Sequence, residues 1–338
     1  MMPRAKNDIV FFEVFREEAA ALKKLFLPKV NARFCESTIQ ESRPRRCPSF
    51  ISIRTQSVIP PSWASTLRGI LSRSTGYDHL SAYRRETNTP AACGYLPAYC
   101  SRAVAEHAIL IMMALWRKLP GQISSFPEFN RHGLTGSECF GKNLLVVGVG
   151  RIGQEIVRMA RGLGLRVKGV DLVSRMKSCE YVSLARGLSW AHAVICAVPL
   201  TPLTRGMLGY QQMKKCRPGL IVVNVSRGEV TPAGDLCRMM DAGIVAGAGL
   251  DVFENEDRVA AALRRGRFGR DALTKPLFAL KQKGNVIFTP HNAFNTHQAL
   301  QEKALQSVEA TLYFLRRGRF PHPVPDDPPV ARRVVAKK

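Results

Sequence analysis

Short apolar runs recur through the first ninety residues, and a stretch of helical spacing separates the first of them from the next. Runs of four or five residues have the length of buried strands, whereas the spacing of apolar positions in the longer stretch is that of a helix. Strands that alternate with helices are typical of a parallel sheet. The pattern therefore predicts a small α/β unit, with strands at 9–12 and 49–53, a helix at 17–27 between them, and a further element at 67–71.

The same alternation is clearer from residue 143 onward. Six apolar runs have the length and the β-branched content of buried strands, and helical segments separate them. This spacing predicts a doubly wound parallel sheet. The six predicted strands are 144–149, 166–170, 193–198, 220–225, 247–252 and 286–289.

Other segments connect or flank the two predicted sheets. Residues 89–99, TPAACGYLPAY, are rich in proline and small residues, which predicts a connector. Residues 101–119 predict a helix that is apolar almost all round, as buried and interface helices are. The charged segment 257–284 indicates an excursion of loop and helix. Residues 300–315 predict a helix, and the Pro-rich, basic tail from Pro321 a loose terminus.

Length and composition narrow the class of protein. The chain has 338 residues, enough for two domains of ordinary size. Its longest apolar run, 108–116, is far shorter than the roughly 20 residues that span a bilayer. The short run after MMPRAKND lacks the apolar core of a signal peptide. Nine scattered cysteines without a CxxC pair argue against zinc and against a disulfide framework. We therefore expect a soluble, cytoplasmic protein without a metal.

The formal charge of +24 raises the question of an anionic partner. Basic stripes attract the phosphates of nucleic acids and of membrane surfaces. Here the basic residues are spread from Arg4 to Lys338, and no RNA-recognition, zinc-finger or KH signature is present. We therefore expect a generally basic surface and neither a nucleic-acid nor a membrane partner.

Residues 148–153, GVGRIG, follow one predicted strand and open a predicted helix. In that context Gly148 permits a tight turn, Gly150 lets the backbone approach a pyrophosphate, and Gly153 lets helix and sheet pack closely. Asp171 ends the next predicted strand, 18 residues after Gly153. A carboxylate there accepts hydrogen bonds from ribose hydroxyls and repels a 2′-phosphate, so NAD is favoured over NADP. Arg175 nearby weakens that preference.

Three charged residues follow predicted strands of the same sheet: Arg227, Glu256 and His291. Because the carboxyl ends of parallel strands meet at one crevice, we expect them on the nucleotide-binding side. Arginine suits the carboxylate of a 2-keto acid. A protonated imidazole suits the charge that develops on the carbonyl oxygen, and a carboxylate beside it favours the charged ring. The trio predicts hydride transfer with His291 as proton donor and Glu256 as its partner.

These motifs resemble the D-isomer-specific 2-hydroxyacid dehydrogenase family. The likeness rests on GVGRIG, VPLT, NVSRGE, LDVFENE and TPHNAFNT, and extends to RSTGYDH at 73–79 and LPAYCSRAVAEHA at 96–108. It implies a catalytic trio of Arg227, Glu256 and His291. We call residues 148–153 the glycine turn. The resemblance implies that the dinucleotide is contacted by residues of this turn and of the later strand ends: Gly148, Gly150, Arg151, Ile152, Gly153, Asp171, Val198, Pro199, Thr204, Val225, Ser226, Arg227, Asp251 and His291. The substrate contacts that it implies are Ser74, Thr75, Gly76, Tyr99, Arg227 and Phe294.

Within that family, HNAFNT and LPAY are similar to the D-lactate dehydrogenase branch. Tyr99 and Phe294 would then line the substrate side-chain pocket, and an aromatic wall favours small keto acids such as pyruvate. Two alternatives stay open. One is a glyoxylate or hydroxypyruvate reductase. The other is an NAD(H)-sensing, corepressor-like interaction protein on the same fold, which a turnover assay distinguishes from an enzyme.

The resemblance also implies a fold of two doubly wound, Rossmann-like α/β domains. The substrate domain would be discontinuous, with residues 1–99 and 293–338, and the NAD-binding domain would span 100–292. Helix 101–119 would serve the interface of a homodimer. One departure is Asp257, which stands where the family commonly has proline, beside the predicted catalytic glutamate.

Overall fold

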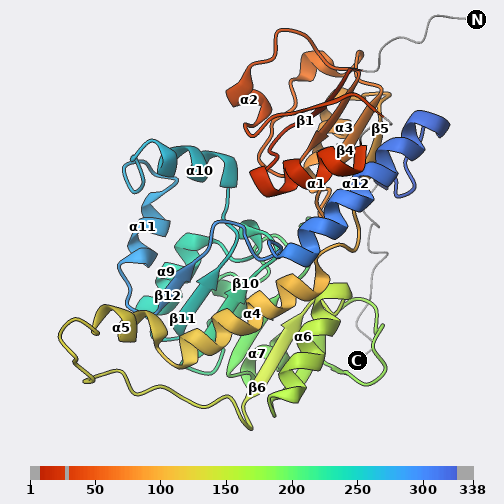
Figure 1. Ribbon diagram of the computed structural model, residues 1–338. Coiled ribbons are helices and arrows are strands. Elements are labelled where there is room, and N and C mark those ends of the chain that lie inside the picture. Colours follow the sequence, from red (N-terminus) through yellow and green to blue (C-terminus); the bar gives the residue numbers. More distant parts are fainter. Residues whose placement is uncertain (1–7, 27–29, 326–338) are drawn as a thin grey trace, which may run out of the picture. The chain divides into compact units, whose positions relative to one another are not determined.

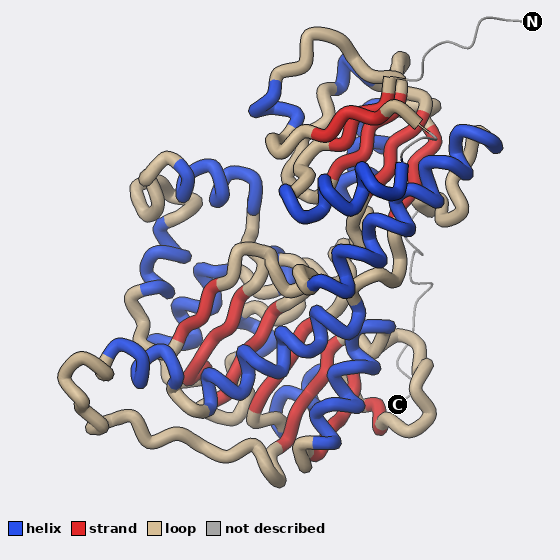
Figure 2. Tube along the Cα trace, in the orientation of Figure 1, coloured by secondary structure: helices blue, strands red, loops and turns tan. Residues whose placement is uncertain are grey.

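The computed structural model describes residues 8–26 and 30–325, and these form two compact units (Figures 1 and 2). One unit comprises Met1–Tyr99 with His297–Lys338, and the other comprises Cys100–Thr296. Each is built on a parallel sheet with flanking helices, which confirms the predicted α/β, Rossmann-like class. The first unit is discontinuous in sequence. The chain returns to it from the second unit between residues 296 and 297, whereas we expected the return between 292 and 293.

The first unit contains a five-stranded sheet in the order β2-β1-β3-β4-β5, with every pair parallel. The predicted strands and the first predicted helix are confirmed within one or two residues, and helices α1 and α12 lie side by side (Figure 2). The strands are β1 (Ile9–Phe11), β2 (Ala32–Phe34), β3 (Phe50–Ile53), β4 (Gly69–Ser72) and β5 (Ala92–Tyr95). The helices are α1 (Arg16–Phe26), α2 (Ile39–Ser42), α3 (Asp78–Thr87) and α12 (His297–Arg317), with a short 3-10 turn η1 (Pro61–Trp63).

Two predictions for this unit were wrong. The supposed connector 89–99 contains the edge strand β5, and residues 322–324 pair with it instead of being loose. The backbone N–H of Tyr95 donates to His322, and that of Val324 donates to Cys93, at 3.1 and 2.8 Å. Gly94 explains the unusual composition, because a Cβ there would lie 2.3 Å from the ring of Phe320. The rest of the tail, 326–338, lies outside the described residues.

Three charged side chains are fully buried beneath the same sheet. Arg73, which follows β4, donates from Nε to Oε1 of Glu18 on α1 at 3.0 Å, and Nζ of Lys303 on α12 lies 3.0 Å from Oε2. Burial opposes the ionisation of Glu18, but the charges of Arg73, Lys303 and Arg54 outweigh it and lower the pKa of Glu18 to about 2. Burial lowers the pKa of Lys303 to about 7, although Glu18 favours its charged form. One carboxylate therefore lies between a buried guanidinium and a buried amine.

The second unit contains a seven-stranded parallel sheet in the order β12-β11-β10-β9-β6-β7-β8. The six predicted strands are confirmed with ends shifted by up to two residues, while the two-residue edge strand β8 was not predicted. The strands are β6 (Asn143–Val147), β7 (Arg166–Val170), β8 (Glu180–Tyr181), β9 (Ala193–Cys196), β10 (Leu220–Asn224), β11 (Val245–Leu250) and β12 (Val286–Phe288). The strand order reverses between β6 and β9, so the sheet has the switch point at which such folds bind ligands.

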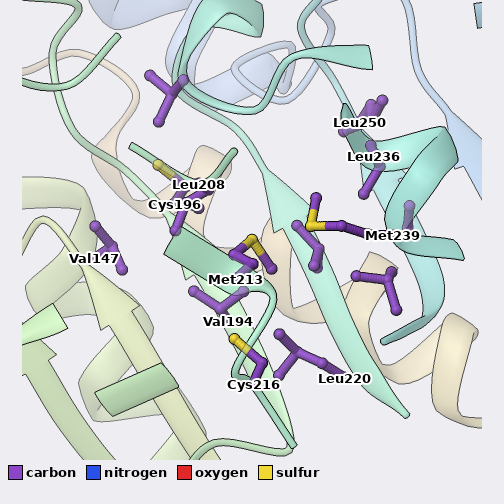
Figure 3. Close-up of a cluster of buried hydrophobic side chains, with 14 of the residues drawn as sticks. Val147, Val194, Cys196, Leu208, Met213, Cys216, Leu220, Leu236, Met239 and Leu250 are labelled. Atoms are coloured by element: carbon purple, nitrogen blue, oxygen red, sulfur yellow. The ribbon is translucent and has the colours of Figure 1, made fainter. Parts of the chain in front are cut away.

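Helices cover both faces of this sheet. Helices α4 (Ser101–Trp116) and α6 (Arg151–Gly162) pack together on one face, as Figure 1 shows. The other face carries a buried apolar cluster that includes Val194, Met213 and Met239 (Figure 3). The helices on that side are α7 (Leu184–Trp190), α8 (Tyr210–Met213), α9 (Ala233–Asp241) and α11 (Lys275–Lys281); α5 (Leu119–Ser124), α10 (Glu256–Arg264) and the 3-10 turn η2 (Gly228–Val230) complete the unit.

Helix α4 is shorter than the predicted 101–119. It ends at Trp116 because Lys118 adopts a left-handed conformation, with φ +51°, after which α5 begins. Most of its apolar side chains are buried, but Leu110 is 62% exposed. In the described part of the chain, none of the helices is both long enough and apolar enough to cross a membrane.

Candidate active site

The glycine turn after β6 has the geometry of a phosphate cradle. Gly148 has φ +92°, and a Cβ on Gly153 would lie 1.9 Å from the carbonyl oxygen of Gly148, so both positions require glycine. A Cβ on Gly150, by contrast, would meet open space. Gly150 is the N-cap of α6, and no side chain caps that helix. The backbone N–H groups of Gly150, Arg151 and Ile152 therefore face a site that fits the pyrophosphate of a dinucleotide.

Asp171 lies directly after β7, beside this cradle. Its Oδ2 accepts a hydrogen bond from the N–H of Val149 at 2.8 Å, and its Oδ1 accepts from Val173 at 3.1 Å. Nη1 of Arg175 lies 3.9 Å from Oδ1. The backbone thus fixes the carboxylate, and its remaining lone pairs can accept from ribose hydroxyls.

The other residues predicted to contact the dinucleotide follow the next strands of the sheet. Val198, Pro199 and Thr204 lie in the loop after β9, where the Thr204 hydroxyl donates to the Pro199 carbonyl at 2.7 Å. Val225 and Ser226 follow β10, and the Ser226 hydroxyl donates to Asn224 Oδ1 at 2.8 Å. Since all of these strands are parallel, their carboxyl ends share one edge of the sheet.

The structure brings two members of the predicted trio into contact. Nδ1 of His291, after β12, lies 2.7 and 2.8 Å from the two carboxylate oxygens of Glu256, the first residue of α10. Each side chain is 18% exposed. The other glutamate of the motif, Glu254, instead accepts from the N–H of Ala233 at 2.9 Å. Because Nδ1 faces the carboxylate, Nε2 is the nitrogen left for a reacting group.

The backbone at this pair adopts an uncommon conformation. His291 has φ +50°, and Asn255, which precedes Glu256, has φ +49°. A left-handed conformation at a residue other than glycine costs about 1–3 kcal/mol and persists where the surroundings hold it. Such positions cluster at functional sites.

Arg227 follows β10, the strand next to β11, which in turn pairs with β12. Its Nη1 donates to the carbonyl of Ser226 at 2.8 Å, and its own carbonyl accepts from Asn224 at 2.8 Å. Its guanidinium therefore belongs to the same carboxyl edge as the pair.

Sequence reasoning missed the residues that hold the loop around His291. Asp251, predicted only as a dinucleotide contact, is 1% exposed and accepts from the N–H groups of Asn292 and Ala293 at 2.8 and 3.0 Å. The Thr289 hydroxyl also donates to it, and His107 of α4 contacts Thr289. A signal was present in the sequence, since His107 is the one histidine of α4 and an apolar run, residues 108–116, follows it.

The predicted substrate contacts are divided between the units. Phe294 belongs to the second unit and is 4% exposed. Ser74, Thr75 and Gly76 follow β4 of the first unit, where the Ser74 hydroxyl donates to the Gly76 carbonyl at 2.6 Å, and Tyr99 is that unit's last residue before α4.

Comparison with known proteins agrees with this geometry. Residues 109–293 match the family model of the D-isomer specific 2-hydroxyacid dehydrogenase NAD-binding domain. A glyoxylate reductase from Pyrococcus furiosus is 31% identical over 278 residues, which cover 76% of this chain and 75% of that protein. A D-specific alpha-keto acid dehydrogenase from Enterococcus faecalis is 30% identical over 73% of this chain and 75% of its own length.

Solved structures share the fold. The D-lactate dehydrogenase from Aquifex aeolicus, complexed with NAD and lactic acid, matches with a TM-score of 0.81 at 24% identity, over 95% of this chain and all of that one. The family model spans more than half of the chain and includes the glycine turn, Asp171, Arg227, Glu256 and His291. The predicted family and the predicted NAD cofactor are thereby confirmed: the chain belongs to the D-isomer specific 2-hydroxyacid dehydrogenases and is an NAD-binding oxidoreductase of two Rossmann-like units.

Proposed function

We propose that this enzyme interconverts a small 2-keto acid, with pyruvate preferred, and the D-2-hydroxy acid in the cytoplasm, by reversible hydride transfer with NADH. The single observation that carries the proposal is the hydrogen-bonded pair of His291 and Glu256 at the carboxyl edge of a dinucleotide-binding sheet. The nine free thiols fit a reducing compartment.

The trio has complementary roles in this proposal. The planar guanidinium of Arg227 binds the substrate carboxylate through two parallel hydrogen bonds. NADH, when bound, supplies the hydride. Nε2 of His291 donates a proton to the carbonyl oxygen as negative charge develops there, and Glu256 holds the ring in place through Nδ1.

The preference for pyruvate rests on the aromatic residues Phe294 and Tyr99, which match the D-lactate dehydrogenase branch. That resemblance favours a keto acid with a methyl side chain over one with a phosphorylated side chain. The relatives include glyoxylate reductases, so glyoxylate and hydroxypyruvate are the competing substrates.

A substrate panel tests the proposal. We expect NADH oxidation with pyruvate at a higher kcat/KM than with glyoxylate or hydroxypyruvate, NADH preferred to NADPH, and D-lactate as the product. Arg227→Gln should raise the KM for pyruvate about 10- to 100-fold, because a charge-assisted pair is worth about 1.5–3 kcal/mol. An L product, or a glyoxylate kcat/KM above that for pyruvate, contradicts the proposed substrate. Negligible turnover of every keto acid favours the NAD(H)-sensing alternative.

We also propose that the enzyme is a homodimer. In the second unit, large apolar side chains are exposed on α4, on α5 and along the segment that follows, and a second copy of the same surface would cover them. They are Leu110, Ile123, Phe126, Phe129 and Phe140, each 62–78% exposed.

Analytical ultracentrifugation checks this assembly. We expect a dimer for the wild type and a shift toward monomer for Leu110→Glu, because a buried unpaired carboxylate destabilises an interface. Leu305→Glu, on the exposed side of α12, serves as the control and should remain dimeric. A wild type that sediments as a monomer at micromolar concentration would contradict the proposal.

A further inference from the structure

We infer that His107 is a positioning residue for His291, which it influences through Thr289 and Asp251. The inference rests on the proposed role of His291 as proton donor. His107 lies on α4, far in sequence from the loop that it contacts. Its Nε2 is 3.0 Å from Oγ1 of Thr289 and 3.7 Å from Oδ1 of Asp251. All of these residues belong to the second unit.

The hydrogen-bond directions along this chain are fixed by donor count. The Thr289 hydroxyl has one proton, which it donates to Oδ1 of Asp251 at 2.5 Å. Thr289 Oγ1 must therefore accept the bond from His107, so Nε2 of His107 carries a hydrogen. His107 therefore donates to the hydroxyl of Thr289, which in turn donates to the buried carboxylate of Asp251.

Asp251 also binds the loop around His291 through several hydrogen bonds. Besides the Thr289 hydroxyl, its side chain accepts from the N–H groups of Asn292 and Ala293, and its backbone carbonyl accepts from the N–H of His291 at 2.8 Å. The residues on both sides of His291 are thus bound to one carboxylate. That carboxylate is 1% exposed, so water does not replace a lost donor easily.

The hydrogen bonds to Asp251 hold a segment whose backbone conformation is unfavourable. His291 is held at φ +50°, a conformation that relaxes when its surroundings loosen. A shift of the loop would move Nε2 relative to the carbonyl oxygen that it protonates, and misplacement of about 1 Å costs about 100-fold in rate. The binding of the substrate carboxylate would change little, because Arg227 follows a different strand.

The experiment compares His107→Leu with His107→Gln, whose side-chain amide can still donate to Thr289. We expect kcat for keto-acid reduction to fall about 10- to 100-fold in His107→Leu, with the keto-acid KM within about twofold, and to recover largely in His107→Gln. Thr289→Val should produce a similar loss, and the His107→Leu/Thr289→Val double variant should lose little more than either single variant. Thr289→Ser should retain activity.

His192→Leu is the matched control. His192 is also half-buried and its Nδ1 accepts from a backbone N–H, that of Asn143 at 3.0 Å, but it lies just before β9, at the opposite edge of the sheet. Its loss should leave kcat unchanged. If His192→Leu lowers kcat as much as His107→Leu does, or if His107→Leu retains full kcat, the inference is overturned.

A spectroscopic readout separates this inference from the proposed function. In ¹⁵N-histidine NMR spectra, the ring signals of His291 should shift or broaden in His107→Leu and stay in place in His192→Leu. Unchanged His291 signals in both variants overturn the positioning role whatever the activity. A wild type without keto-acid turnover that still shows the selective shift contradicts the proposed reaction and leaves the positioning of His291 supported.

Discussion

Replacement of His291 by asparagine is expected to lower kcat for keto-acid reduction by about 10²–10⁴-fold, the usual contribution of a positioned general acid. Asparagine cannot donate a proton to the developing oxyanion, although it preserves polarity. The loss should appear in kcat, and NADH affinity measured by fluorescence titration should change only a few-fold. The 2.7 Å contact with Glu256 makes the expectation specific to this ring.

A second histidine provides the control for this experiment. His297, six residues later, is exposed at the start of α12, and His297→Asn should match the wild type. More than a tenth of wild-type kcat in His291→Asn would refute the assignment.

The second large effect is expected far from the chemistry, in the buried cluster of Arg73, Glu18 and Lys303. Glu18→Gln should lower the free energy of unfolding by about 3–5 kcal/mol, because breaking a buried ion pair leaves uncompensated charge in the interior. All three side chains are 0% exposed, so solvent does not screen the guanidinium of Arg73 that remains. Urea unfolding followed by circular dichroism measures the change.

Two further variants separate the effect of the buried Glu18 charge from that of any other change on the same helix or in the same cluster. Glu17→Gln alters the exposed neighbour on the same helix and should cost under about 0.5 kcal/mol. Lys303→Met leaves a balanced pair of Arg73 and Glu18, so it should cost less than Glu18→Gln. Equal losses in Glu17→Gln and Glu18→Gln would contradict the argument.

Acid should expose the same interaction. The pKa of Glu18 is lowered from its ordinary value of 4.5 to about 2 in the folded protein. Its contribution to stability is therefore complete above pH 4.5 and is lost as pH falls toward 2, since the unfolded chain takes up the proton first. Glu18→Gln should show a shallower loss of stability than the wild type in this window.

The sequence predicted the sheets where the apolar runs were long enough to show a period. The central strands β6, β9 and β10 are continuous buried runs, and β7 shows the alternation of a half-buried strand. Strand β5 was missed because Gly94 and its small neighbours are selected for the close approach of Phe320, which removes the β-branched signal. Strands β2 and β8 are two or three residues long, too short for any periodicity.

The candidate site residues were predicted from their positions directly after strands. In a parallel sheet such positions lie at the same edge, so residues far apart in sequence come close together. Sequence reasoning paired Glu256 with His291 across 35 residues from their residue types and their positions after predicted strands. In the structure they are in contact, and the strands that they follow, β11 and β12, are adjacent and parallel. Sequence reasoning could not find the support around the pair. The link from His107 to Thr289 spans 182 residues and depends on α4 packing beside the sheet, which no local pattern records.

The interleaving of the two units has a consequence for synthesis on the ribosome. Residues 100–296 are continuous, so the nucleotide-binding unit can complete its fold while the chain is still growing. The other unit cannot, because Lys303, which lies against Glu18, and residues 322–324, which pair with β5, emerge after residues 100–296. Until then Glu18 lacks one of its two basic partners, and we expect chaperones to recognise the incomplete N-terminal part of the sheet.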